Sequence, residues 1–213
     1  MRKWYPWAVA VVAFLASALV FGRAPDQVPV HWNAAGEVDR YGSRLEGLFL
    51  LPVVILGIAL LIPALPKLDP RSRNYDRFRP TYHLVMNATL TFMLALHLVM
   101  IGNMLGMDLP MERLAPAGVG LLLVVIGNAL PRARPNWMFG IRTPWTLSND
   151  RVWERTHRVG GYLMAGAGLV LLLAALLVPS RLMVWPLIGT ITVAALGSVV
   201  YSYVAWRQET RPR

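Results

Sequence analysis

The chain has 213 residues, of which 56% are hydrophobic and only 15% are charged. Average globular domains carry about 25% charged residues. The apolar residues here also form long blocks, which leaves almost nothing for a water-soluble domain. Cysteine is absent, so disulfides and cysteine-based metal sites are excluded.

Six apolar blocks are long enough to cross a bilayer, because about 20 helical residues at 1.5 Å each cover about 30 Å of hydrocarbon. They are residues 4–22, 48–65, 82–105, 114–130, 159–178 and 184–206. The sequence therefore predicts an all-α fold, a polytopic bundle of six transmembrane helices that forms a single membrane domain over residues 1–213. Residues 1–66 would supply the first two spans, and residues 82–213 a four-span part.

The basic residues are distributed unevenly between alternate segments. Of the 21 lysines and arginines, 16 precede the first span, lie in the second and fourth loops, or follow the last span. This positive-inside pattern predicts cytoplasmic N and C termini, a cytoplasmic segment 131–161 and an external loop 23–46. The net charge of +10 then reflects topology and attraction to anionic lipid headgroups. We expect the lipid bilayer as a partner and no direct binding of nucleic acid.

The external loop combines turn residues with aromatic and titratable side chains. Two prolines favour an extended entry, and residues 33–36 are typical of a turn in which Gly36 takes positive φ. The loop fits a capped surface turn at the headgroup level, and equally a recognition surface for an external ligand. His31 with Glu37 or Asp39 is too weak a pattern to predict a metal site.

The second span contains Pro52 and Pro63, each of which removes a backbone hydrogen bond from a helix. Lipid offers no water to replace that bond, so we expect neighbouring helices to supply donors. The basic loop at residues 67–80 that follows is interpreted as a determinant of topology.

The third span is the most polar helix. At 100° per residue, one stripe about 120° wide contains His83, Asn87, Thr91 and His97. Such a stripe faces a bundle interior or a cavity and indicates an intramembrane functional site, or else hydrogen bonds between helices. A small transporter or ion-coupled carrier using this stripe is one functional alternative. Against it, no span contains a carboxylate and no inverted repeat is apparent.

The densest polar and aromatic run occupies residues 136–161, NWMFGIRTPWTLSNDRVWERTHRVGG. Prolines before and within it predict an ordered loop, and Thr146 or Ser148 is expected to cap a helix starting near Asn149. We expect a short amphipathic interfacial helix that turns into the fifth span at Gly160-Gly161. Arg142 would bind carbonyl groups or lipid phosphate. The run is interpreted as structural, or as a docking surface for a cytoplasmic partner.

Catalytic motifs are weak in this chain. Glu154-x-x-His157 resembles half of a carboxylate metal motif, but one copy supplies too few ligands. HExxH, a nucleophile elbow and a phosphate-binding glycine loop are absent. We therefore predict a non-enzyme without catalytic residues, metal or cofactor. A membrane enzyme with Glu154 and His157 as acid and base is the competing alternative.

Two runs carry a resemblance to a known family. Residues 136–148, with Val152-Trp153 and Thr156-His157-x-x-Gly160-Gly161, resemble the signature of the SdpI family of bacterial membrane immunity proteins. Residues 29–33, with Gly36, Asp39 and Gly42, are similar to the small uncharacterised membrane domain that often precedes that signature. The two occur in the expected order, and the resemblance covers nearly the whole chain.

The resemblance implies a multi-pass protein of the bacterial cell membrane that confers resistance to a secreted, membrane-active peptide toxin. It also implies signalling, in which a cytoplasmic transcriptional repressor is held at the membrane. Carried over to this sequence, the external ligand-recognition residues would be His31, Trp32, Asn33, Gly36 and Asp39. The cytoplasmic partner-docking residues would be Phe139, Arg142, Thr143, Trp145, Asn149, Trp153 and His157.

Overall fold

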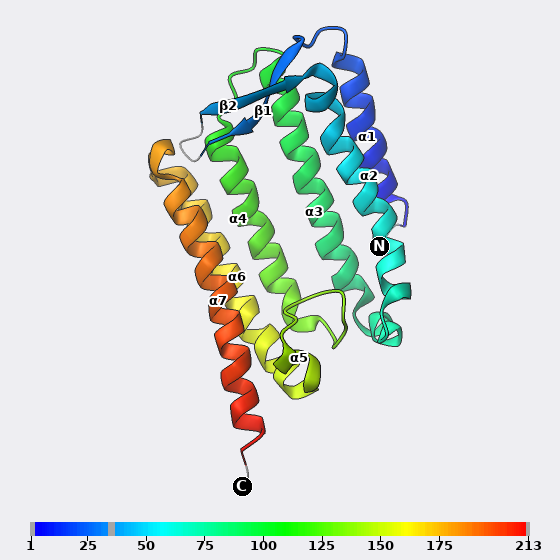
Figure 1. Ribbon diagram of the computed structural model, residues 1–213, viewed down its shortest axis with the longest axis vertical. Helices are drawn as coiled ribbons and strands as arrows, with labels where there is room; N and C mark the ends of the chain where they lie inside the picture. Colours follow the sequence, from blue (N-terminus) through cyan, green and yellow to red (C-terminus); the bar gives the residue numbers. More distant parts are fainter. Residues whose placement is uncertain (1–2, 34–36, 212–213) are drawn as a thin grey trace.

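The computed structural model describes residues 3–33 and 37–211, and it is a helical bundle with one β-hairpin (Figure 1). The elements, in chain order, are α1 (Tyr5–Val20), β1 (Gln27–Trp32), β2 (Val38–Ser43), α2 (Arg44–Leu68), α3 (Tyr75–Met104), α4 (Met111–Ala129), α5 (Pro144–Ser148), α6 (Asp150–Leu177) and α7 (Val184–Glu209). The hairpin lies at one end of the bundle. At the opposite end lie α5 and the segment that precedes it.

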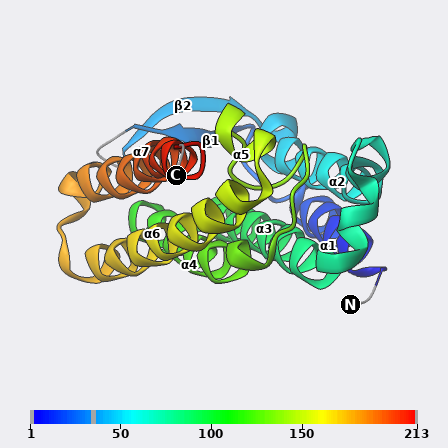
Figure 2. The same cartoon turned by 90° about the horizontal axis from the view of Figure 1, so that it is seen from below.

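All six apolar blocks form helices, and within the described chain five of these helices are long and apolar enough to cross a membrane. These five are α2, α3, α4, α6 and α7. Helix α1 is apolar but has only 16 residues. Viewed along the bundle, α6 and α7 lie on one side and α1 and α2 on the other, with α3 and α4 between them (Figure 2).

The segment that was predicted to be an external loop is a β-hairpin, so the all-α prediction was incomplete. Strands β1 and β2 pair antiparallel, from Gln27 opposite Ser43 to Trp32 opposite Val38. Val28 is fully buried and packs against Gly47 of α2. A Cβ added to Gly47 would lie only 2.3 Å from Val28 Cγ2. The missing side chain on α2 thus makes room for a strand residue, and this packing joins the hairpin to the bundle.

Strand β2 passes directly into α2. The Ser43 side chain accepts a hydrogen bond from the Glu46 N–H at 3.2 Å and so caps the helix. Arg44, the first helical residue, pairs with Asp26 at 2.5 Å. The hairpin therefore has a defined orientation over the helix ends.

Side chains from other helices compensate for two prolines of α2, Pro52, as predicted, and Pro66. Pro66 cannot donate to the Ile62 carbonyl, and the Tyr82 hydroxyl of α3 donates to that oxygen at 2.8 Å. Pro52 leaves the Leu48 carbonyl without its helical donor, and Ser17 of α1 supplies a hydroxyl. Helices α1, α2 and α3 are thereby linked by polar contacts that replace lost backbone bonds.

Glycines allow α4 and α6 to approach closely. A Cβ on Gly168 would lie 2.4 Å from the Gly120 carbonyl oxygen, and a Cβ on Gly127 would lie 2.5 Å from that of Gly161. This close packing does not extend to Gly166, where a Cβ would meet no atom within 4 Å.

Candidate functional site

Residues 131–161, called here the motif segment, fold into a compact structure at the end of the bundle opposite the hairpin (Figure 1). A loop leads from the end of α4 to α5, and α6 begins two residues after α5 ends. The interior of this structure is polar, and backbone amides of the loop point at two buried side chains, Asp69 and Asn136.

Asp69 lies in the α2–α3 connection and holds the motif segment through its backbone. Its side chain is only 3% exposed. Oδ2 accepts hydrogen bonds from the N–H groups of Trp137 at 2.8 Å and Met138 at 3.1 Å, and Oδ1 accepts one from the N–H of Arg71 at 2.7 Å. The Tyr75 hydroxyl donates to Oδ2 at 3.1 Å. Four donors converge on this carboxyl group, an arrangement that suits an ionised, acceptor-only carboxylate.

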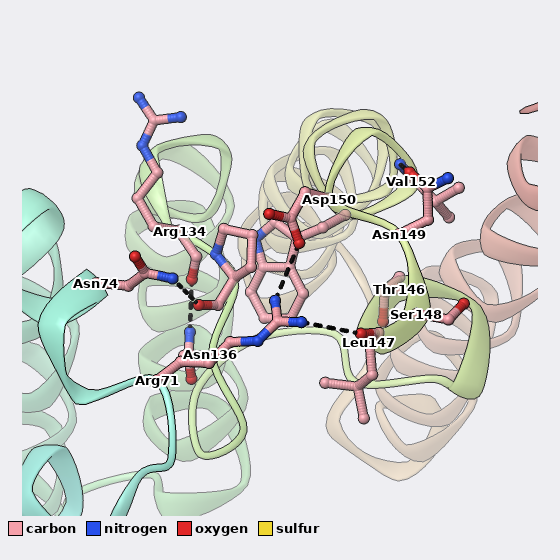
Figure 3. Close-up of polar contacts among 12 residues, drawn as sticks. Arg71, Asn74, Arg134, Asn136, Thr146, Leu147, Ser148, Asn149, Asp150 and Val152 are labelled. Carbon is pink, nitrogen blue, oxygen red and sulfur yellow. Dashed lines mark hydrogen bonds and ion pairs between the residues drawn. The ribbon is translucent and has the colours of Figure 1, made fainter.

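Asn136 organises the turn of the loop itself. Its Oδ1 accepts from the N–H groups of Phe139 at 2.6 Å and Met138 at 3.0 Å, and its Nδ2 donates to the Arg134 carbonyl at 2.8 Å. Asn74 of the α2–α3 connection donates to the Pro135 carbonyl at 2.7 Å. Figure 3 shows the bonds that Asn74 and Asn136 donate to backbone carbonyls. Beside them, Arg71 reaches the Asp150 carboxylate at 3.0 Å and the Leu147 carbonyl at 3.3 Å.

Sequence analysis missed Asp69, because the loop containing it was interpreted only as a determinant of topology. The available signal was a single carboxylate followed by proline in a strongly basic stretch. Asn136 opened the motif that carried the family resemblance, yet it was not assigned to a site. Both residues act on backbone groups, which sequence patterns do not reveal.

The helix caps differ from those predicted. Neither Thr146 nor Ser148 caps α6, and an additional helix, α5, is capped by Thr143, which forms a capping box with Thr146. Asn149 is extended, with φ −146° and ψ 119°, and its Oδ1 accepts from the N–H groups of Arg151 and Val152 to cap α6. The prediction was wrong because the segment contains two helices in succession, and each has its own cap.

Trp153 and His157 form the buried centre of the motif segment. Both are fully buried, and their rings stack with centroids 3.9 Å apart. Trp153 Nε1 donates to the Ala133 carbonyl at 2.9 Å. His157 Nε2 accepts from the Ile141 N–H at 3.0 Å, so the Nδ1–H must donate to the Trp153 carbonyl at 2.8 Å. Both ring nitrogens are therefore engaged in holding the loop.

Glu154 has a different partner from His157. It is exposed and pairs with Arg134 at 3.0 Å. The predicted neighbouring acid and base are thus directed to separate contacts.

Gly140 is required by the same packing. Its φ is +109°, a region that side chains disfavour. A Cβ at this position would lie 2.4 Å from His157 Nε2.

Helix α6 continues without a break through Gly160 and Gly161, so the predicted separate interfacial helix is wrong. The helix does not turn at these glycines because both of them pack closely against other elements. Gly161 meets the Gly127 carbonyl of α4, and Gly160 meets Ile141 and Ser198. The glycines permit close packing while the helix remains straight enough to retain its hydrogen bonds.

Helix α7 closes the motif segment from the other side. Thr143 Oγ1 donates to Ser202 Oγ at 3.0 Å, and the rings of Trp145 and Tyr203 have centroids 5.1 Å apart. Arg155 pairs with Glu209 at 3.3 Å. The motif segment is therefore fixed to the bundle by the α2–α3 connection and by α7.

The seven residues predicted for partner docking fall into two groups. Phe139, Thr143, Trp153 and His157 are buried and hold the loop. Arg142 is exposed, while Trp145 and Asn149 are half-buried. Arg142 donates to the Trp137 carbonyl at 3.0 Å, which confirms the predicted carbonyl contact.

The polar stripe of α3 turns partly toward α1. His97 Nε2 lies 2.8 Å from Ser17 Oγ, and Thr91 Oγ1 lies 2.7 Å from the Tyr5 hydroxyl. Asn87 Oδ1 is buried and has no hydrogen-bond partner within the described residues. His83, near the N-terminal end of α3, instead lines a separate cavity.

Of the residues predicted for ligand recognition, His31 and Trp32 lie on β1 and Asp39 lies on β2. His31 Nδ1 is 2.6 Å from Asp39 Oδ1, and Asn33 Nδ2 donates to Glu37 at 3.1 Å. Gly36 lies outside the described residues. Beneath the hairpin is a largely apolar cavity of about 400 Å³, which His31, Trp32 and Asn33 line together with residues of α2, α3, α4 and α7. The structure thus brings three of the predicted recognition residues to one cavity.

Comparison with known proteins assigns both ends of this molecule to described families. Residues 132–202 match the SdpI/YfhL protein family. The chain is also 24% identical over 163 residues to the immunity protein SdpI of Bacillus subtilis strain 168, a similarity that covers 76% of each protein. Residues 132–202 thus form an SdpI/YfhL family segment, and the similarity to SdpI extends over most of the chain.

The N-terminal part of the chain matches a second description. Residues 8–56, which include most of α1 and the hairpin, match a domain of unknown function, DUF1648. The uncharacterised membrane protein YbgB of the same Bacillus strain is 30% identical over 53 residues, which is 25% of this chain and 58% of that protein. No solved structure matches the chain.

Proposed function

We propose that the protein is a non-enzymatic immunity protein that protects its cell from a secreted, membrane-active peptide. The similarity to the immunity protein SdpI over 76% of both chains carries the proposal. The protein would reside in the bacterial cell membrane, and its five long apolar helices suit that location.

The cavity beneath the hairpin is the proposed site of peptide recognition. Its lining includes Met100, Met111 and Met183, and methionine side chains adapt to irregular apolar surfaces. Trp32 lies in its wall, and Asp39 holds His31 at its edge. A peptide that inserts into membranes has an apolar face, which is the chemistry that such a cavity accepts.

A survival assay tests this function directly. A sensitive bacterium expressing the chain is challenged with a panel of membrane-active peptides. We expect protection against at least one peptide, lost in Trp32→Ala and Asp39→Asn. Tyr41→Ala is the matched control, because Tyr41 is 59% exposed on the same hairpin. Equal protection by all variants would contradict recognition at the cavity.

The proposed topology has six spans, with both termini in the cytoplasm. Helix α1 would be the sixth span. Its 16 residues at 1.5 Å extend only about 24 Å, and Trp4, which precedes it, would anchor its end at the membrane interface. Since the chain has no cysteine, single cysteines can report sidedness. A membrane-impermeant maleimide should label Asp39→Cys in intact cells and Arg158→Cys only after permeabilisation. Labelling of both in intact cells would contradict this topology.

Sequestration of a cytoplasmic transcriptional repressor is the second part of the proposal. The accessible surface for it comprises Arg142, Trp145 and Asn149, while the buried motif residues would position that surface. In a strain that expression of the chain protects from a toxin, Arg142→Ala should release a repressor from the membrane fraction, while protection from the toxin is retained. Retention of the repressor by this variant would place docking elsewhere.

A small transporter is the alternative function. Two buried polar atoms of α3, Asn87 Oδ1 and His97 Nδ1, have no hydrogen-bond partner within the described residues, and such atoms are suited to a passing solute. Absence of protection from every peptide, together with transport that is lost in His97→Ala, would favour this alternative.

A further inference from the structure

A second and larger cavity lies at the opposite end from the hairpin, where α1 and α3 begin and α2 ends. Its volume is about 770 Å³, within the range of cavities that hold small molecules. Trp7, Ala59, Ile62 and Pro63 contribute apolar wall. The motif segment and the hairpin do not contribute to the described lining.

Basic side chains line the mouth of this cavity. Lys3, Lys67 and Arg79 line it, together with the carboxylate of Asp76. Asp76 forms an ion pair with Arg79. Among the described residues, Lys3 and Lys67 form no ion pair, and both are exposed. The two lysines therefore give the cavity mouth a net positive charge that lacks a partner within the described chain.

The apolar part continues along α2 away from these charges. Lys67 and Ala59 are eight positions apart in the sequence, which corresponds to about 12 Å along a helix. A ligand that fills the cavity must be anionic at one end and apolar for at least this length. Basic pockets between transmembrane helices bind anionic lipid headgroups by this arrangement.

We propose that this cavity binds one anionic glycerophospholipid. Its phosphate lies between Lys3 and Lys67, and an acyl chain lies along Ala59 and Ile62. Neutral choline lipids lack the net negative charge that the two lysines require.

The bound lipid would also stabilise the motif segment. Tyr75 and Tyr82 line the cavity, and on their other sides they contact the motif segment. The Tyr75 hydroxyl lies 3.1 Å from Asp69 Oδ2 and 3.2 Å from Asn136 Oδ1, which share its one proton. The Tyr82 ring contacts that of Phe139, with centroids 5.7 Å apart. A lipid that restrains these two tyrosines restrains the residues that hold the loop.

Native mass spectrometry of the full chain, released from nanodiscs, tests the proposal. With equal amounts of phosphatidylglycerol and phosphatidylcholine, we expect one phosphatidylglycerol to be retained. The double variant Lys3→Gln/Lys67→Gln should bind it at least tenfold more weakly, because each lysine near an anionic surface contributes appreciably. The matched control is Arg73→Gln/Arg77→Gln, which removes the same charge from exposed positions of the same region outside the cavity.

Three results would overturn the proposal: equal retention of both lipids, equal loss in the control variant, or no loss in the lysine variant. Inorganic phosphate distinguishes a lipid from a free anion. If phosphate alone protects the chain from thermal unfolding as well as phosphatidylglycerol does, the ligand is not a lipid.

In hydrogen exchange, phosphatidylglycerol should slow exchange at Trp137 and Met138 in the native chain, but not in the lysine variant. Unchanged exchange would overturn the link to the motif segment.

Discussion

The hydroxyl of Ser17 in α1 lies 2.5 Å from the carbonyl oxygen of Leu48 in α2, the acceptor that Pro52 leaves without its helical donor. A hydroxyl has one proton, and this shortest contact takes it. His97 Nε2, 2.8 Å from Ser17 Oγ, then acts as the donor to the serine oxygen. One small side chain therefore links three helices at a proline.

Ser17→Ala should destabilise the protein by about 1–2 kcal/mol, because the Leu48 carbonyl loses its hydroxyl donor and His97 loses its contact with Ser17. Adding Pro52→Ala should recover part of this loss, since the new N–H can donate to Leu48. Thermal unfolding in detergent measures both effects. Ser198→Ala is the control, because that buried hydroxyl bonds to the Ala194 carbonyl of its own helix. Equal effects of the two serine substitutions would contradict the interhelical role.

Asp69→Asn should loosen the motif segment. The amide presents an NH₂ group either at Oδ2, where Trp137, Met138 and Tyr75 donate, or at Oδ1, where the Arg71 N–H donates. At least one backbone N–H therefore loses its acceptor, at a cost of about 1–3 kcal/mol. Hydrogen exchange at Trp137 and Met138 should become faster. Asp76→Asn removes an equal charge from an exposed position and should leave that exchange unchanged. Protection that survives Asp69→Asn would show that Asn136 alone holds the loop.

Gly168→Ala should destabilise the α4–α6 pair, because the added Cβ would lie 2.4 Å from the Gly120 carbonyl oxygen. Gly166→Ala, two positions away, meets nothing within 4 Å and should stabilise the protein by up to about 1 kcal/mol through helix propensity. The unfolding midpoints of the two variants should move in opposite directions. A shift in the same direction would mean that these helices are less closely packed in the membrane.

Gly140→Ala should cost more than Gly106→Ala. Both glycines have positive φ, +109° and +85°, so alanine at either introduces backbone strain of about 1–2 kcal/mol. At Gly106 the space is open, whereas at Gly140 the methyl group collides with His157. The difference in unfolding free energy between the variants isolates that collision. Similar losses would show that His157 can move away.

The apolar blocks were enough to predict where the helices lie, because a bilayer requires long uninterrupted runs. The hairpin was missed, since its stability depends on Val28 packing against a glycine on another element. Continuity of α6 was missed for a related reason. Whether Gly160 and Gly161 interrupt a helix depends on what they face, and the neighbours of a glycine cannot be inferred from its own sequence.

The composition of the motif segment pointed correctly to an ordered structure around Arg142. It could not separate the residues that hold the loop from those that face outward. Trp153 and His157 have the chemistry of a binding surface, yet they are fully buried. That distinction follows from the hydrogen bonds to Ala133 and Ile141, which join residues 16 to 20 positions apart.

Asp69 lies outside both segments that match described families, residues 8–56 and 132–202. Its carboxylate nevertheless fixes the backbone of the second segment at Trp137 and Met138. A chimaera that joins the first segment of one relative to the second segment of another would therefore separate the loop from its acceptor if the two relatives differ at this position. The unit that can be exchanged intact is the motif segment together with the short connection that precedes α3.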